Sequence, residues 1–169
     1  MRAEHIETRL ATGEDEPMLW IALAWAAHMP GDGSSDDVQA ARTEPALAVY
    51  AENFGTAGDV GVIALEAGTH GFVGAAWLRP IRAYAFVREN VPELAIGVDS
   101  AWRGHGVGGR LMRELLEAAD SDYAATCLSV RRENPAVRLY ERLGYEMVPG
   151  SVIENRVGGE SITMLRTRP

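Results

Sequence analysis

The chain has 169 residues, of which 47% are hydrophobic and 24% are charged, and this balance is typical of a single globular domain rather than of a disordered chain. Its formal net charge of -8 argues against nucleic acid as the main partner, because neutralising phosphates requires an excess of basic residues, and it suits a cationic substrate. One cysteine, four scattered histidines, no secretory signal and no apolar run long enough to cross a bilayer predict a cytoplasmic protein without disulfides or a metal site.

The first fifty residues predict a strand followed by helices. The expected elements are a strand over residues 6–10, a helix from about 15 to 27, and one or two short helices over 38–50. Asp15 is the expected cap of the first helix, because Pro17 is tolerated only in a first turn. Ser35 or Asp36 can cap the next helix.

The middle of the chain predicts a β-hairpin, a loop and a further strand. Two apolar, β-branched runs at residues 60–67 and 71–79 are separated by a short polar stretch, so they should pair antiparallel. Residues 80–92 show weak periodicity and predict a loop. Residues 93–98 alternate with the period of two that is typical of a strand.

A glycine-rich turn joins this strand to the next predicted helix. The turn reads Arg103-Gly104-His105-Gly106-Val107-Gly108-Gly109, and apolar residues at helical spacing follow it to about Ala119. The first N–H groups of a helix lack intrahelical partners, and the helix dipole favours negative charge there. Glycine brings no side chain that would hold a phosphate away from the backbone. The turn therefore predicts a phosphate or pyrophosphate site.

Other phosphate-binding patterns compete for this turn. Gly104, Gly106 and Gly109 also satisfy the dinucleotide pattern of a Rossmann unit. That fold normally places an acidic residue at the end of the next strand, where Glu133 is only a late candidate. A triphosphate loop is excluded, because no Gly-Lys-Ser or Gly-Lys-Thr follows the glycines. An NAD-type dinucleotide-binding protein stays as the remoter alternative.

The last third of the chain predicts strands around one helix. The expected strands cover residues 126–130, 145–148, 152–157 and 161–165, and the last two should form a hairpin across Gly158-Gly159. The helix should begin at Asn134 and Pro135, since asparagine is a good cap and proline suits the first position. Gly144 should end it.

The glycine-rich turn and the segment Asn134–Tyr145 together resemble the GNAT superfamily of N-acetyltransferases. In that family a strand is followed by an Arg/Gln-x-x-Gly-x-Gly/Ala turn, which Arg103–Gly108 matches. An Asn-x-x-Ala-x-x-x-Tyr-x-x-x-Gly-Phe/Tyr segment comes later, which residues 134–145 match with Val137 where alanine is commonest. The resemblance is specific from Glu93 to Val148.

The resemblance implies an α/β (α+β) fold in a single domain over residues 1–169. Its central twisted sheet would be mixed, mostly antiparallel, of six or seven strands, splayed in the middle and flanked by about four helices. The implied reaction is transfer of an acetyl group from acetyl-CoA to an amine. The acceptor would be a small molecule or a peptide. The protein would need no metal and would bind neither nucleic acid nor a membrane. A homodimer is left open, and a CoA-binding sensor without catalysis is the alternative.

The resemblance also implies which residues hold acetyl-CoA. The turn would bind the pyrophosphate, with Arg103 either contacting it or bracing the loop. The strand ending at Val98 would hydrogen-bond the pantetheine arm, and an N–H near Val98 would polarise the thioester carbonyl. The residues expected at the coenzyme are Ile96, Gly97, Val98, Arg103, Gly104, His105, Gly106, Val107, Gly108, Gly109 and Asn134.

Two residues are the candidates for catalysis. Tyr140 matches the family's proton donor, and a phenol of pKa near 10 can protonate a thiolate of pKa about 8.5 when hydrogen-bonded to it. The alternative for Tyr140 is a packed core aromatic. Glu93 is a candidate general base acting through a water molecule, and the alternative is an unused surface carboxylate.

The acceptor side would be formed by the helices after the first strand. Asp32, Asp36 and Asp37 lie in that region, where they either attract an amine or only cap a helix. The loop over residues 80–92 should cover the acceptor.

Overall fold

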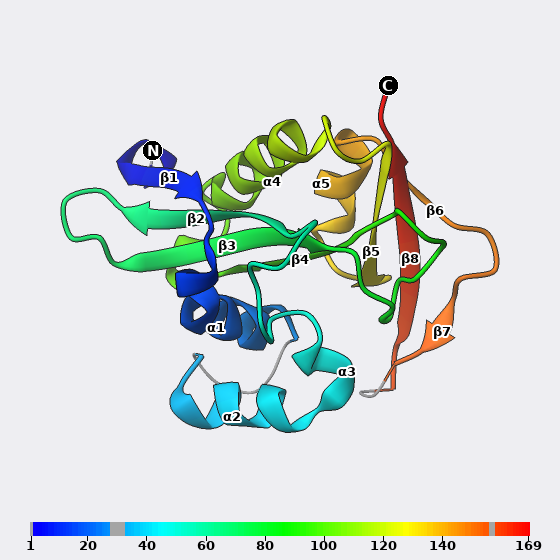
Figure 1. The fold of residues 1–169 in the computed structure, drawn as a ribbon, viewed down its shortest axis with the longest axis horizontal. Coiled ribbons are helices and arrows are strands. Elements are labelled where there is room, and N and C mark those ends of the chain that lie inside the picture. The colour runs from blue at the N-terminus through cyan, green and yellow to red at the C-terminus, as the bar shows by residue number, and fades with distance from the viewer. Residues whose placement is uncertain (1, 28–32, 156–157) are drawn as a thin grey trace.

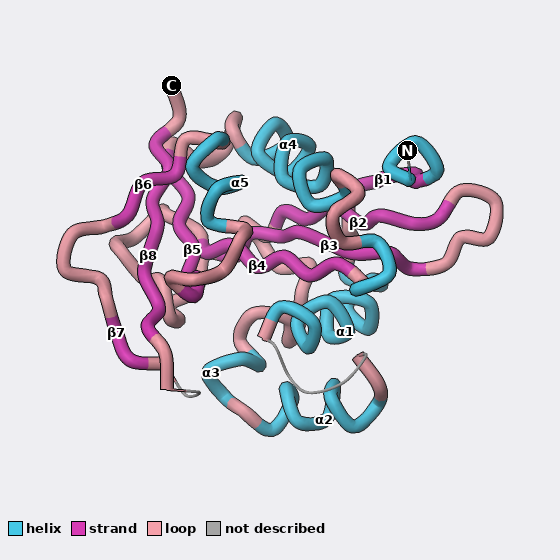
Figure 2. Tube along the Cα trace, turned by 180° about the vertical axis from the view of Figure 1, so that it is seen from behind, coloured by secondary structure: helices cyan, strands magenta, loops and turns pink. Residues whose placement is uncertain are grey.

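The computed structural model describes residues 2–27, 33–155 and 158–169, which form one mixed sheet with helices on both faces (Figures 1 and 2). The strands are β1 (Ile6–Leu10), β2 (Val60–Glu66), β3 (Phe72–Arg79), β4 (Glu93–Val98), β5 (Ala125–Arg131), β6 (Tyr145–Met147), β7 (Ile153–Glu154) and β8 (Glu160–Thr167). The α-helices are α1 (Glu16–Ala26), α2 (Ser35–Thr43), α3 (Pro45–Ala48), α4 (Val107–Ala119) and α5 (Val137–Arg142).

The sheet confirms the predicted architecture. Its order is β1-β2-β3-β4-β5-β8-β6, with β7 paired to β8. Only β4 and β5 pair in parallel, whereas all the other pairs in the described residues are antiparallel. The predicted hairpins are present as β2–β3 and β7–β8. The described chain has eight strands, one in each of the eight ranges that the sequence patterns predict, whereas the family resemblance implied six or seven.

The helices divide into two layers (Figures 1 and 2). α4 and α5 lie on one face of the sheet, and α1, α2 and α3 lie on the other. The apolar stripe of α4 packs into the core of the first face, and the buried members are Val107, Leu111, Met112, Leu115, Leu116 and Ala119. A second core lies between α1–α3 and the sheet. A third, smaller cluster joins Ala85 and Val91 to Ala125 and Cys127 of β5.

The helix caps show one confirmation and one correction. Asp15 occupies the N-cap position of α1, with Pro17 in the first turn, as predicted. The cap of α2 is Ser34, not Ser35 or Asp36. Asp37 N donates to Ser34 Oγ at 3.4 Å, and the Asp37 carboxylate accepts from Ser34 N at 3.2 Å. This reciprocal pair satisfies two N–H groups at the helix start, so the helix begins one residue earlier than the first candidate cap implied.

α1 approaches the sheet closely at Gly97 of β4. A Cβ built on Gly97 would lie 1.9 Å from Ala22 O and 2.6 Å from Ala22 C. Both are backbone atoms of α1, so the helix itself would have to move. Glycine is therefore required here by the close approach of two backbones.

We expect Gly97→Ala to lower the free energy of unfolding by about 3 kcal/mol, because overpacking against backbone cannot be relieved by a rotamer change. Chemical denaturation measures the loss. Gly108→Ala is the matched control, since its Cβ would lie 3.8 Å from Leu139 and 3.9 Å from Ile96, ordinary contact distances. It should change the free energy of unfolding by at most about 1 kcal/mol, in the stabilising direction. Equal losses in both variants would contradict the close-approach argument.

Candidate active site

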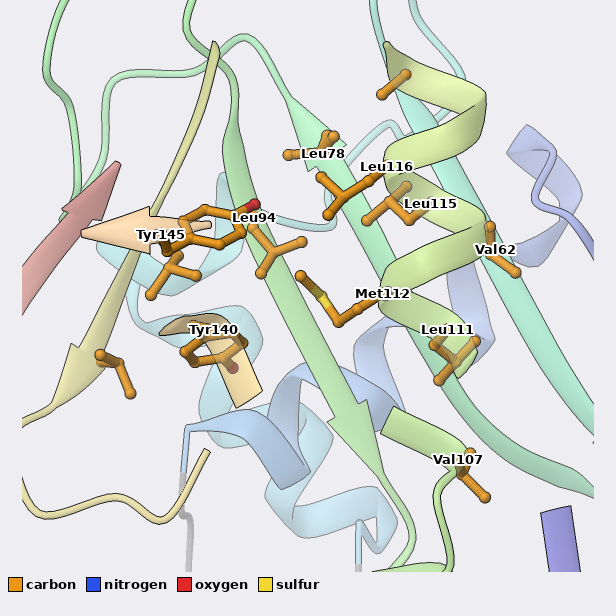
Figure 3. Packing of buried hydrophobic residues seen from close by; sticks show 14 of the residues in the cluster. Val62, Leu78, Leu94, Val107, Leu111, Met112, Leu115, Leu116, Tyr140 and Tyr145 are labelled. Atoms are coloured by element: carbon orange, nitrogen blue, oxygen red, sulfur yellow. The ribbon is translucent and has the colours of Figure 1, made fainter. Parts of the chain in front are cut away.

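β4 and β5 form a fork. β3 and β4 share six register pairs, from Gly74–Val98 to Arg79–Glu93, whereas β4 and β5 share one, Glu93–Cys127. Figure 3 shows the two strands diverging beyond that point. Within the described residues, the edge of β4 that faces β5 therefore has no strand partner from Leu94 to Val98. The predicted splay in the middle of the sheet is present.

The glycine-rich turn lies at the open end of this fork, between β4 and α4. Gly104 and Gly106 adopt left-handed φ angles of 76° and 82°, and Gly106 is the N-cap of α4. The first backbone bond into the helix is donated by Arg110 N to Gly106 O, at 3.1 Å. In the described part of the chain, the N–H groups of residues 104–109 donate to no protein acceptor. Six consecutive N–H groups are thus available to an anion beside the helix N-terminus.

Arg103 and His105 are both exposed on this turn. Arg103 Nε donates to Val98 O at 3.0 Å, which ties the turn to the end of β4. This is the bracing contact that the sequence left as one of two alternatives. Contact of Arg103 or His105 with a phosphate stays a prediction.

Tyr140 comes from α5 and lies between the ribbons of β4 and β5 in Figure 3. Tyr140 is 6% exposed, and its ring contacts the ring of Tyr145 edge-on, with centroids 6.0 Å apart. The Tyr140 hydroxyl makes no hydrogen bond with any residue that the structure describes. Burial, and secondarily Tyr145, raise the pKa of Tyr140, so the phenol stays protonated at neutral pH. Tyr140 is therefore packed in the core and still carries the proton that a donor needs.

Asn134 precedes α5 in a turn. Its Oδ1 accepts from Ala136 N at 2.9 Å, and Val137 N donates to Asn134 O at 3.0 Å. The regular helix begins at Val137, two residues after Pro135, its predicted first position, because residues 134–136 close this turn first. The Asn134 side chain thus closes a turn before the helix, whereas the N-cap of α5 is Ala136, and contact of Asn134 with pantetheine stays a prediction.

Glu93 is the residue for which the structure changes the interpretation most. Its side chain is 0% exposed, so the alternative of a surface carboxylate is wrong. Oε1 accepts from Tyr50 Oη at 2.9 Å and from Ala85 N at 2.7 Å, and Oε2 accepts from Ala83 N at 2.6 Å. The role of general base stays a prediction.

The acidic residues expected at the acceptor side differ in burial and in role. Asp37 is buried and its carboxylate accepts from the backbone of Ser34, the cap of α2, whereas Asp36 is exposed. Asp32 lies outside the described residues. Across those residues, no three His, Cys, Asp or Glu side chains gather as metal ligands, and none of the helices is long and apolar enough to cross a membrane.

A sequence model of the family described as "Acetyltransferase (GNAT) domain" matches residues 56–147, more than half of the chain. This chain belongs to the GNAT acetyltransferases. The matched range includes the hairpin, the fork, the glycine-rich turn and Tyr140.

A curated relative aligns along most of this GNAT chain. Mycothiol acetyltransferase from Thermobifida fusca is 30% identical over 159 residues, which make up 90% of this chain and 46% of that protein. The chain spans less than half of each curated relative that it matches, from 14% to 46% of their lengths.

Solved structures share the GNAT fold along nearly the whole chain. Ribosomal-protein-alanine N-acetyltransferase from Brucella melitensis superimposes with a TM-score of 0.70 at 23% identity, covering 96% of this chain and 99% of that one. YncA from Salmonella typhimurium, solved with its cofactor acetyl-CoA, gives a TM-score of 0.66 at 16% identity, covering 96% and 94%. At these identities the likeness shows the fold.

The sequence reasoning missed Tyr50 beside this GNAT site, whereas Tyr84 lies in the loop that it expected to cover the acceptor. Tyr50 donates its hydroxyl proton to Glu93, and the rings of Tyr50 and Tyr84 stack with centroids 6.4 Å apart. Tyr50 and Glu93 are 43 residues apart in the chain. No local pattern relates residues at such a distance, so the contact is visible only in the folded chain.

Proposed function

We propose that the protein is an acetyl-CoA-dependent N-acetyltransferase that uses the β4–β5 fork as its active site. The observation that carries the proposal is the row of N–H groups at residues 104–109, which donate to no acceptor among the described residues and lie at the open end of the fork. A second feature of the same fork supports it, since Tyr140 is largely buried there and its hydroxyl makes no hydrogen bond with any described residue.

The residues present fit the coenzyme. The N–H groups of residues 104–109 would hold its pyrophosphate, and Arg103 would keep the turn in place through Val98. The unpaired edge of β4 would bind the pantetheine arm as a strand binds its neighbour, with Ile96, Gly97 and Val98 supplying main-chain groups. An N–H near Val98 would stabilise the oxyanion. Asn134 would contact the arm from the start of α5.

The proposed chemistry is direct transfer. The neutral amine of the acceptor attacks the thioester carbon, the carbon–sulfur bond breaks, and the thiolate leaves. Tyr140 gives its proton to that thiolate, and the phenolate recovers a proton that the product amide nitrogen has lost, through solvent. A tyrosine with a raised pKa suits this role, because it enters every cycle protonated.

Release of free thiol tests the proposal. The full chain is incubated with acetyl-CoA and a panel of amines that contains peptide N-termini, free amino acids and polyamines. We expect thiol to appear in equal amount to acetylated amine for at least one class. Binding of acetyl-CoA with no thiol release from any amine would favour the CoA-binding sensor. The acceptor amine, the cytoplasmic location, the single domain and the homodimer stay predictions.

A further inference from the structure

Glu93 stands at the point where the fork closes. It is the first residue of β4 and forms the one register pair with β5, opposite Cys127. The carboxylate is fully buried, yet none of the described Arg or His side chains forms an ion pair with it. Its charge is instead met by two backbone N–H groups and one phenol. A buried carboxylate is tolerated when such donors surround it.

Two of the three donors belong to the Pro80–Pro92 loop. Ala83 N and Ala85 N point at the two oxygens of the same carboxylate. The Ala85 side chain also packs with Val91 against Cys127 and Ala125 of β5. The loop is thus bound to the closed end of the fork by one side chain of β4 and by a small apolar cluster (Figure 1).

The third donor, Tyr50, is itself held rigidly. Its carbonyl oxygen accepts from Trp77 Nε1 at 2.7 Å. The guanidinium of Arg79 donates to the neighbouring carbonyls of Val49 and Glu52, at 2.9 and 2.8 Å, and pairs with Asp59. β3 therefore fixes the segment from which Tyr50 reaches Glu93. Burial first, and then the Glu93 charge, raise the pKa of Tyr50, so it remains a hydrogen-bond donor.

These contacts lie on the side from which an acceptor would approach. The glycine-rich turn and Tyr140 belong to the α4 and α5 side of the sheet, which the coenzyme would occupy. The cluster of Tyr50 with Ala75, Trp77 and Ala95 belongs to the opposite side. There the loop presents Tyr84, which is 37% exposed and stacks on Tyr50.

We infer that Glu93 is a positioning residue, which binds Tyr50, Ala83 and Ala85 so that Tyr84 and the rest of the Pro80–Pro92 loop form a fixed wall of the acceptor site. The inference rests on the proposed function, because it names the acceptor side of the same fork. In this interpretation Glu93 is an anchor and not a general base, because its carboxylate already accepts hydrogen bonds from three protein donors.

Tyr50→Phe and Glu93→Gln test the inference in the full chain. The first removes one donor and little else. The second places an amide where Ala83 and Ala85 present N–H groups, so one of the three contacts becomes a clash of donors. Tyr123→Phe is the matched control, since it removes a phenol that donates to Gly58 O at 2.7 Å, away from the fork. Steady-state kinetics with each substrate varied, coenzyme affinity and thermal unfolding are measured for all three.

We expect the acceptor KM to rise by about fivefold in Tyr50→Phe and about tenfold or more in Glu93→Gln, with the acetyl-CoA affinity within about twofold of the original. The pH profile of kcat/KM should keep its acidic limb in Glu93→Gln, because a positioning residue takes no proton from the acceptor amine. Tyr123→Phe should leave both KM values unchanged. The inference would be overturned if Glu93→Gln lost the acidic limb while Tyr50→Phe behaved like the original protein, because Glu93 would then act as a general base. Equal changes in the KM values for acceptor and acetyl-CoA would also overturn it, because a general loss of structure produces such changes.

Amide hydrogen exchange gives a readout that does not depend on activity. If the anchor exists, Glu93→Gln should speed exchange in residues 80–92 and leave residues 104–109 as in the original protein. The same change in exchange is expected even if no amine releases thiol. In that case the proposed function fails, and the exchange data alone test whether Glu93 anchors the loop. Unchanged exchange in the loop would overturn the anchor whatever the kinetics show.

Discussion

Gly104→Glu is expected to abolish acetyl-CoA binding, raising the dissociation constant by about 100-fold or more. Gly104 is exposed, and a side chain built on it would meet no atom within 4 Å, so the fold can accommodate the glutamate. The new carboxylate would lie among the N–H groups of residues 104–109, where it competes with the pyrophosphate and repels it. Isothermal titration calorimetry measures the change.

Gly150→Glu is the matched control for backbone strain. Both glycines have a φ of 76°, and a Cβ built on either one meets no atom within 4 Å. Each variant should therefore incur a similar cost of about 1–2 kcal/mol for a left-handed non-glycine residue. Only the variant at residue 104 should lose the coenzyme. Tight binding by Gly104→Glu would mean that the anion binds elsewhere.

Tyr140→Phe is expected to lower kcat by about tenfold or more while the acetyl-CoA affinity stays within about twofold. The phenol hydroxyl makes no hydrogen bond with any described residue, so its removal leaves none of their polar groups unsatisfied. Since burial raises the pKa of Tyr140, the defect should persist from about pH 6 to about pH 9, where the original tyrosine stays protonated. Stopped-flow thiol detection at several pH values measures it.

The neighbouring Tyr145 supplies the control for Tyr140. Its hydroxyl is already hydrogen-bonded to Thr126 Oγ1 at 2.7 Å, and burial raises its pKa to about 12. Tyr145→Phe removes a phenol from the same pair of rings and should cost stability while leaving kcat within about twofold. If both variants turned over at the original rate, Tyr140 would have no part in proton transfer.

The parts of the fold that the sequence predicted are those governed by local rules. The alternation in residues 93–98 predicted β4, and the glycines followed by a helical apolar stripe predicted the turn and α4. Each pattern reflects one strand face or one helix face, which a short window contains. The fork itself came from the family resemblance, since no local pattern shows where two strands diverge.

The surroundings of Glu93 could not be predicted in this way. Two of its partners are backbone N–H groups of a loop with weak periodicity, and the third is the phenol of Tyr50, far away in the chain. A carboxylate after a proline looks like a surface residue when only its neighbours in sequence are considered. Its burial follows from the loop folding back over the closed end of the fork.

A crystal structure of the full chain with acetyl-CoA tests the central claim most directly. The account predicts the diphosphate within about 3 Å of backbone nitrogens in residues 104–109, and the sulfur beside the Tyr140 hydroxyl between β4 and β5. A diphosphate bound away from this turn, or a sulfur out of reach of Tyr140, would contradict it.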